Sequence, residues 1–221
     1  MSIHFPGESA DYRRQRDELL NAEIQLRKQL EAVAALRRTL PAGGRVPQDY
    51  VFEEEQGTIR LSQLFKPGHQ SLIVYNFMYG PAMPKPCNAC TSILDGLNGS
   101  SPHVNDRISF VVVAKSPIQR IQEVARQRGW SNLRLLSSAA NTYNLDYFGE
   151  KEDGSQWPML NVFSKRPDGI YHTYGTEMFA APSEPGQDGR HVDLIWPIWN
   201  LFDFTPEGRG TKWYPKLEYE S

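Results

Sequence analysis

Apolar residues follow two spacings along this chain, one typical of a helix and one typical of buried strands. From about Asp11 to Leu40 the chain is charged and free of proline, and its leucine, isoleucine and valine residues recur at mostly helical spacing. Pro41 and the glycines after it end this pattern. We therefore expect a helical arm over residues 1–44 and a second domain over residues 45–221.

Short apolar runs rich in β-branched residues alternate with helical segments in the second domain. The runs at 72–77 and 108–114 are expected to be buried strands. A helix follows each of them, and the second helix is expected to have Ser116 as its cap and Pro117 at its first position and to end at Gly129. A further helix is expected over 138–145. Alternating strands and helices predict parallel strand pairs.

A β-hairpin is expected near the end of this pattern. Residues 159–163 and 170–174 are β-like and flank Asp168-Gly169, which is a strong hairpin signal. The aromatic segment 191–202 is expected to pack on the sheet as core or as a helix. Together these elements predict an α/β fold with a mixed central sheet flanked by helices and an N-terminal helical arm.

Composition narrows the class of protein. The chain has 221 residues, a formal net charge of −2 and a pI near 6.2, which argue against a nucleic-acid binder. No apolar stretch approaches the roughly 20 residues of a membrane span. The N-terminal residues lack the basic and then apolar pattern of a secretion signal, so we expect a cytoplasmic protein without a membrane partner.

The two cysteines of the chain, Cys87 and Cys90, lie three positions apart between the strand at 72–77 and the next helix. At the N-terminus of a helix, free N–H groups and the helix dipole favour a thiolate over a thiol. A thiolate is the nucleophile of disulfide exchange, and a second cysteine three positions on can resolve the mixed disulfide. Cys87 and Cys90 are therefore the candidate catalytic residues, and Cys87 is expected to be the more exposed and more acidic thiol.

Other uses of the pair are less well supported. Two cysteines are too few for a four-cysteine zinc site, and the five histidines form no second paired cluster. A structural disulfide closing so short a loop would stabilise little, whereas two inert core cysteines stay an alternative. We expect no metal and no cofactor beyond the pair itself.

The order of elements, with a Cys-x-x-Cys pair after the first buried strand, resembles the thioredoxin fold. Thioredoxin-like proteins commonly place a cis-proline opposite the cysteines, and Pro158, at the start of the hairpin, occupies that position here. The resemblance implies a cis Trp157–Pro158 bond and a substrate-binding role for Trp157 and Pro158. The dipeptide Asn88-Ala89 between the cysteines departs from thioredoxin itself, which leaves the redox direction open.

Nearly the whole chain is similar to a bacterial thioredoxin-like family of unknown function, described as predicted dithiol–disulfide oxidoreductases. Short agreements in the same order carry this resemblance, at residues 16–20, 37–41, 49–52, 76–81, 87–91, 172–174 and 203–209. The resemblance implies a fold and a chemical class, but no particular substrate.

The sequence favours a thiol–disulfide oxidoreductase that acts on a protein or small-molecule thiol or disulfide. A non-catalytic thioredoxin-like binding or scaffold protein is the alternative, in which the arm and the aromatic tail recruit a partner. A thiol peroxidase is less favoured, because Pro84 stands where such enzymes carry a threonine. The arm either packs on its own domain or forms a homodimer.

Overall fold

The computed structural model describes residues 3–177, 181–182, 194–208, 210 and 213–219. The chain forms two units, Met1–Pro41 and Ala42–Ser221. In the first unit, the helix α1 runs without interruption over Ala10–Thr39, which confirms the continuous helix expected there. Ser9 caps it, because the Tyr12 backbone N–H donates to the Ser9 hydroxyl at 3.1 Å.

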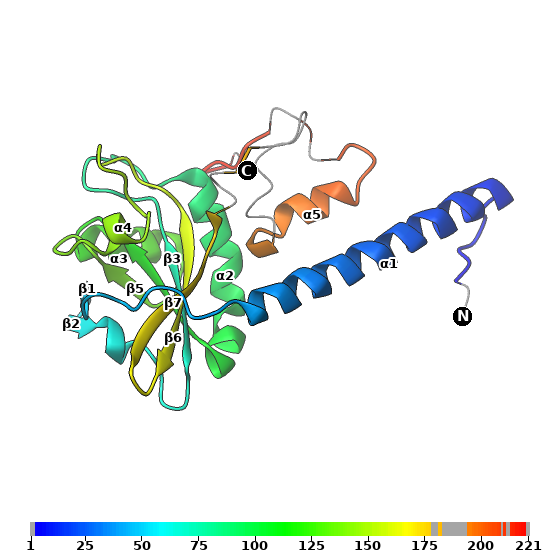
Figure 1. Cartoon of the computed structure of the whole chain (residues 1–221). Helices are drawn as coiled ribbons and strands as arrows, with labels where there is room; N and C mark the ends of the chain where they lie inside the picture. Colours follow the sequence, from blue (N-terminus) through cyan, green and yellow to red (C-terminus); the bar gives the residue numbers. More distant parts are fainter. Residues whose placement is uncertain (1–2, 178–180, 183–193, 209, 211–212, 220–221) are drawn as a thin grey trace. The chain divides into compact units, whose positions relative to one another are not determined.

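Within the described residues, seven strands form one sheet in the order β2-β1-β5-β4-β3-β6-β7 (Figure 1). The strands are β1 (Val51–Glu54), β2 (Gly57–Arg60), β3 (Ser71–Asn76), β4 (Ser109–Ala114), β5 (Leu135–Ser137), β6 (Met159–Arg166) and β7 (Gly169–Gly175). β3, β4 and β5 are parallel, whereas β6 runs antiparallel to both β3 and β7. The expected hairpin is thus β6–β7, and it pairs directly with the strand that leads to the cysteines.

Helices separate the parallel strands and complete the fold. They are η1 (Leu61–Gln63), α2 (Asn88–Arg107), α3 (Ile118–Arg128), α4 (Tyr143–Asp146) and α5 (Ile198–Asp203). Since β3 is followed by α2 and β4 by α3, the chain has the βαβ crossovers and the closing hairpin of a thioredoxin-like α/β fold (Figure 1). Among the described residues, no helix is long and apolar enough to cross a membrane.

Successive side chains along β3 point to opposite faces of the sheet, and each face is covered by its own hydrophobic core. Tyr75 and Phe77 belong to the core beneath α2 and α3, to which Trp196 and Trp199 of the aromatic segment also contribute. Leu72 and Val74 face the opposite core, beside η1 and α4. Of the aromatic segment, residues 191–193 lie outside the described residues. Trp196 and Trp199 pack as core, as expected, whereas Leu194 and Leu201 are exposed.

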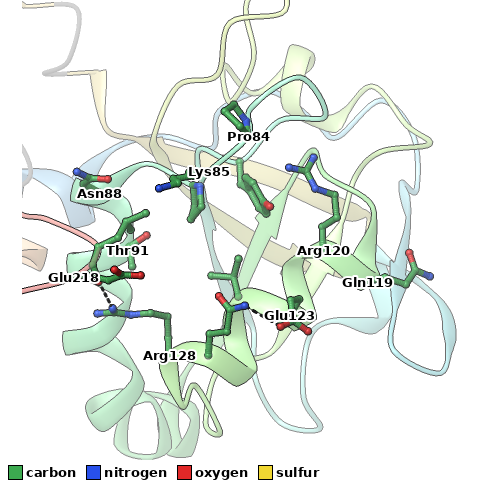
Figure 2. A pocket seen from close by; sticks show the side chains of 14 residues that line it. Pro84, Lys85, Asn88, Thr91, Gln119, Arg120, Glu123, Arg128 and Glu218 are labelled. Atoms are coloured by element: carbon green, nitrogen blue, oxygen red, sulfur yellow. Dashed lines mark hydrogen bonds between the residues drawn. The ribbon is translucent and has the colours of Figure 1, made fainter.

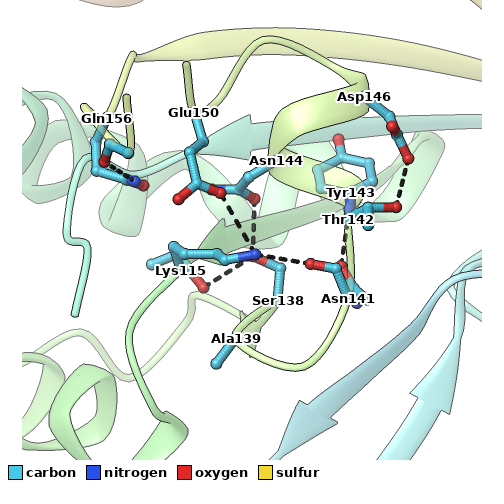
Figure 3. Close-up of polar contacts among 12 residues, drawn as sticks. Lys115, Ser138, Ala139, Asn141, Thr142, Tyr143, Asn144, Asp146, Glu150 and Gln156 are labelled. Atoms are coloured by element: carbon cyan, nitrogen blue, oxygen red, sulfur yellow. Dashed lines mark hydrogen bonds and ion pairs between the residues drawn. The ribbon is translucent and has the colours of Figure 1, made fainter. Parts of the chain in front are cut away.

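Polar contacts fix the loops at the carboxyl ends of the parallel strands (Figure 3). Lys115, directly after β4, donates to the Asn141 carbonyl at 2.7 Å and pairs with the Glu150 carboxylate at 3.4 Å. The buried Ser138 hydroxyl, directly after β5, donates to Asn144 Oδ1 at 2.8 Å. The loop to the cysteines also begins at the carboxyl end of a parallel strand, β3, so it lies beside loops that these hydrogen bonds hold in place.

Two local expectations need correction. Ser116 does not cap α3, because its hydroxyl donates instead to the Gly80 carbonyl at 3.2 Å in the loop before the cysteines. A helix expected over 138–145 is reduced to α4, since Ser138 and Asn141 are engaged in the polar contacts of the preceding loop. At the other end of α3 the expected stop is confirmed: Gly129 adopts a left-handed conformation with φ of 68°.

Candidate active site

The cysteine pair lies where β3 is linked to α2. Cys87 is the N-cap residue of α2, its backbone N–H donates to the Met78 carbonyl at 3.0 Å, and its own carbonyl accepts from the Thr91 hydroxyl at 2.8 Å. Both thiols are free; Cys87 is partly exposed, whereas Cys90 is only 1% exposed. The expected order of exposure is confirmed, and only Cys87 can meet a substrate in solution.

The two thiols have opposite acidities. The pKa of Cys87 is lowered to about 6, and the hydrogen bond from the Cys90 thiol is the largest cause. Burial opposes this shift, whereas the backbone N–H groups of Ala89 and Cys90 add to it. These N–H groups point toward the sulfur, although Cys87 makes no side-chain capping hydrogen bond of full geometry. Burial, followed by the interaction with Cys87, raises the pKa of Cys90 well above its ordinary value. At neutral pH the pair therefore combines a partly exposed thiolate at Cys87 with a buried thiol at Cys90.

Arg120 of α3 fixes the loop that precedes the pair. Its guanidinium donates to the carbonyls of Met83 at 2.6 Å and Pro81 at 3.1 Å, and it lies 4.5 Å from the centre of the Tyr79 ring. The Ser116 N–H adds a hydrogen bond to the Tyr79 carbonyl at 2.9 Å. The local sequence does not predict this role of Arg120, because an arginine on an amphipathic helix usually faces water.

A cavity of about 940 Å³ opens beside the cysteine turn (Figure 2). Side chains of the cysteine motif, of α3 and of the C-terminal segment surround it: Lys85, Asn88, Thr91, Arg120, Glu123, Arg128, Leu217 and Glu218 are among its lining residues. Charged side chains of both signs line the cavity, so it is suited to a polar ligand rather than to a purely apolar one.

The C-terminal segment, residues 213–219, lies against the cysteine motif. The Asn88 side-chain amide, between the two cysteines, donates to the Pro215 carbonyl at 3.1 Å. Burial raises the pKa of Tyr214, and the negative charges of the two cysteines raise it further, which places this phenol close to the pair. Tyr214 could not be predicted from the sequence, since no local pattern links it to a motif more than 120 residues away.

The structure corrects the expectation for Pro158. The Trp157–Pro158 bond is trans. The preceding segment turns back through a bridge between Glu150 and Gln156 and then enters β6 in an extended form, a path that the ordinary trans isomer follows. The Trp157 N–H already donates to the Gly149 carbonyl at 2.9 Å and is not free to pair with a substrate.

Trp157 instead lines a second cavity, of about 830 Å³, together with Tyr147, Phe148, Met159 and His172. Asn161 Oδ1 lies 2.9 Å from His172 Nε2, so this histidine of β7 is held by a hydrogen bond to the neighbouring strand β6. Burial lowers its pKa. Of the four predicted site residues, the structure brings the two cysteines together at the start of α2. Trp157 lines the second cavity, and the substrate-binding role of Trp157 and Pro158 stays a prediction.

Metal-binding side chains do not converge at either cavity. Among the described residues, no three His, Cys, Asp or Glu side chains come together in a group that could hold a metal ion.

Comparison with known proteins identifies the family. A family model described as "Bacterial protein of unknown function (DUF899)" matches residues 1–219. The chain belongs to this family. A search of curated proteins finds no match for this DUF899 member.

Several solved structures share elements with this DUF899 protein. They include peroxidoxin BcpB from Mycobacterium tuberculosis, with 17% identity, a TM-score of 0.47 and coverage of 72% of this chain and 95% of that one. Peroxiredoxin Q from Xanthomonas campestris has 15% identity, a TM-score of 0.44 and coverage of 72% and 96%. The exposed lipoprotein thioredoxin of Streptococcus pneumoniae has 11% identity, a TM-score of 0.43 and coverage of 68% and 99%. Likeness at this level does not extend to activity.

Proposed function

We propose that this protein is a thiol–disulfide oxidoreductase, with Cys87 as the attacking thiolate and Cys90 as the resolving thiol. The observation that carries the proposal is the asymmetry of the pair. Cys87 is partly exposed at the N-terminus of α2 with a pKa of about 6, and a buried, less acidic Cys90 lies next to it.

The chemistry needs only the two thiols and a disulfide. The Cys87 thiolate attacks one sulfur of the substrate disulfide, forming a mixed disulfide and releasing the other half as a thiolate. Cys90 then attacks Cys87, the Cys87–Cys90 bond forms, and the second half leaves with the Cys90 proton. Two electrons pass from the pair to the substrate. The same steps in reverse oxidise a dithiol, and a protein or a small molecule can supply either partner.

Catalysis of insulin reduction by dithiothreitol tests the proposal. We expect the wild-type protein to accelerate the reaction, Cys87→Ser to abolish the acceleration, and Cys90→Ser to accumulate a mixed disulfide with insulin through Cys87. An equilibrium in glutathione redox buffers should give a reversible Cys87–Cys90 disulfide.

Two outcomes contradict the proposal. No acceleration above dithiothreitol alone, with a pair that stays reduced in the glutathione buffers, favours the non-catalytic binding protein. Oxidation of Cys87 by hydrogen peroxide much faster than by any disulfide favours a thiol peroxidase.

We also propose that the arm is a site of homodimer formation. The mass of the full chain in solution at high concentration tests this: a monomer contradicts it.

A further inference from the structure

Tyr75, near the end of β3, carries a polar group in an apolar core. Its side chain is 1% exposed and lies in the core beneath α2. The hydroxyl is buried and makes no hydrogen bond of full geometry. A buried donor without a partner is costly, and such a group in a folded protein calls for an explanation.

Cys90, which is also only 1% exposed, lies in the same core beneath α2. Burial raises the pKa of Tyr75 well above its ordinary value, and the charge of Cys90 is the next largest cause. In return, the phenol lowers the pKa of Cys90 as a hydrogen-bond donor. Cys87 and, from the C-terminal segment, Tyr214 are the other titratable groups that act on this pair of side chains.

The resolving step creates a need for such a donor. Before the reaction, Cys90 donates its proton in a hydrogen bond to the Cys87 thiolate. Once Cys87 is held in a mixed disulfide, that thiolate no longer exists, and Cys90 must itself become a thiolate at a site where burial opposes charge. The donors that remain at its sulfur are the Met78 backbone N–H and the Tyr75 hydroxyl.

We propose that Tyr75 is a catalytic residue of the resolving step, whose hydroxyl donates a hydrogen bond to the Cys90 sulfur as the thiolate forms. This inference rests on the proposed function. In that step the Cys90–Cys87 bond forms, the bond from Cys87 to the substrate sulfur breaks, and the departing thiolate takes the Cys90 proton. Tyr75 keeps its own proton throughout.

Single-turnover reaction of the reduced protein with 5,5′-dithiobis(2-nitrobenzoic acid) separates the two steps. Each step releases one equivalent of coloured thiolate: the first reports attack by Cys87, and the second reports attack by Cys90. For Tyr75→Phe we expect a first phase within twofold of wild type and a second phase about tenfold slower, as for loss of a hydrogen bond worth ~1.4 kcal/mol to a charged group. The second phase should also need a higher pH to reach its maximum.

Tyr143→Phe is the matched control. Tyr143 is also fully buried with an unpartnered hydroxyl, but it lies in the core on the opposite face of the sheet. We expect both of its phases to match wild type. A second phase unchanged in Tyr75→Phe, or slowed equally in Tyr143→Phe, overturns the role of Tyr75.

A second variant covers the case in which Tyr75→Phe does not fold. With 3-fluorotyrosine at position 75, which is nearly isosteric and more acidic, the second phase should reach its maximum at a lower pH than in wild type; an unchanged profile overturns the proposal. Failure of the insulin assay in the wild-type protein contradicts the proposed function itself, whereas normal insulin reduction by Tyr75→Phe with an unchanged second phase contradicts only this inference.

Discussion

Lowering the pH should reveal the acidity of Cys87 more clearly than any measurement at neutral pH. With a pKa of about 6, against an ordinary value of 9.0, about 90% of Cys87 is thiolate at pH 7, compared with about 1% of an ordinary thiol. Each thiolate is less nucleophilic, because intrinsic reactivity falls by a factor of about 16–32 over three pKa units. The net rate advantage at pH 7 is therefore only about three- to sixfold.

The advantage grows as the pH falls. At pH 5 about 9% of Cys87 is still thiolate, whereas an ordinary thiol is ionised to only about 0.01%, so the net advantage becomes about 30–60-fold. Alkylation of the reduced protein by iodoacetamide from pH 4.5 to 9.5 measures this, with free cysteine as the reference. The label should be on Cys87, and the rate should reach half its maximum near pH 6.

Replacement of Cys90 tests the cause of the shift. Since the Cys90 thiol is the largest influence that lowers the pKa of Cys87, Cys90→Ala should move the half-maximum to higher pH. Cys90→Ser retains a donor and should move it less. A wild-type half-maximum at pH 8 or above, an equal response of the two variants, or preferential labelling of Cys90 would refute the reasoning.

Three further predictions concern the support of the site. A methyl group added at Gly149 would overlap a buried asparagine side chain of β3, whereas one at Gly96, on α2, meets open space. In urea titrations, Gly149→Ala should therefore lower the unfolding free energy by about 1–3 kcal/mol, and Gly96→Ala should raise it by ~1 kcal/mol. Equal effects of the two variants contradict this. Arg120→Ala should cost about 1–3 kcal/mol by the same assay, because it removes hydrogen bonds to two loop carbonyls and the contact with the Tyr79 ring, whereas the exposed Arg126→Ala should cost less than about 0.5 kcal/mol. Asn88→Ala should speed alkylation of the first cysteine by about two- to tenfold through release of the C-terminal segment, and a rate equal to that of wild type argues that this segment does not cover the thiol.

Sequence patterns were most informative where the signal is local. The strands at 72–77 and 108–114, the hairpin around Asp168-Gly169 and the continuous α1 follow from apolar spacing and turn residues, and the structure has all of them within a few residues. The place of Cys87 at the start of α2 belongs to the same class, because the end of an apolar run and the start of a helical one lie only a few residues away.

Long-range contacts were beyond such patterns. Asn88 and Pro215 are separated by 127 positions, and only the packing of the C-terminal segment brings them together. The isomer of the bond before Pro158 was predicted wrongly, since a strand-opening proline reads the same in either isomer and the neighbouring loop and strand register decide between them.

Local patterns predict the order of elements, the α/β class, the arm and the candidate thiols, because backbone preferences and apolar periodicity act over a few residues. The acidity of each thiol depends in addition on contacts that form only in the folded protein. Whether Cys87 is the acidic thiol depends on the N–H groups and the buried neighbour that surround its sulfur, and whether Tyr75 is simply a core residue or a donor to Cys90 depends on how α2 packs over β3. Burial and hydrogen bonding at a single sulfur are set by groups distant in the chain, and they govern its chemistry.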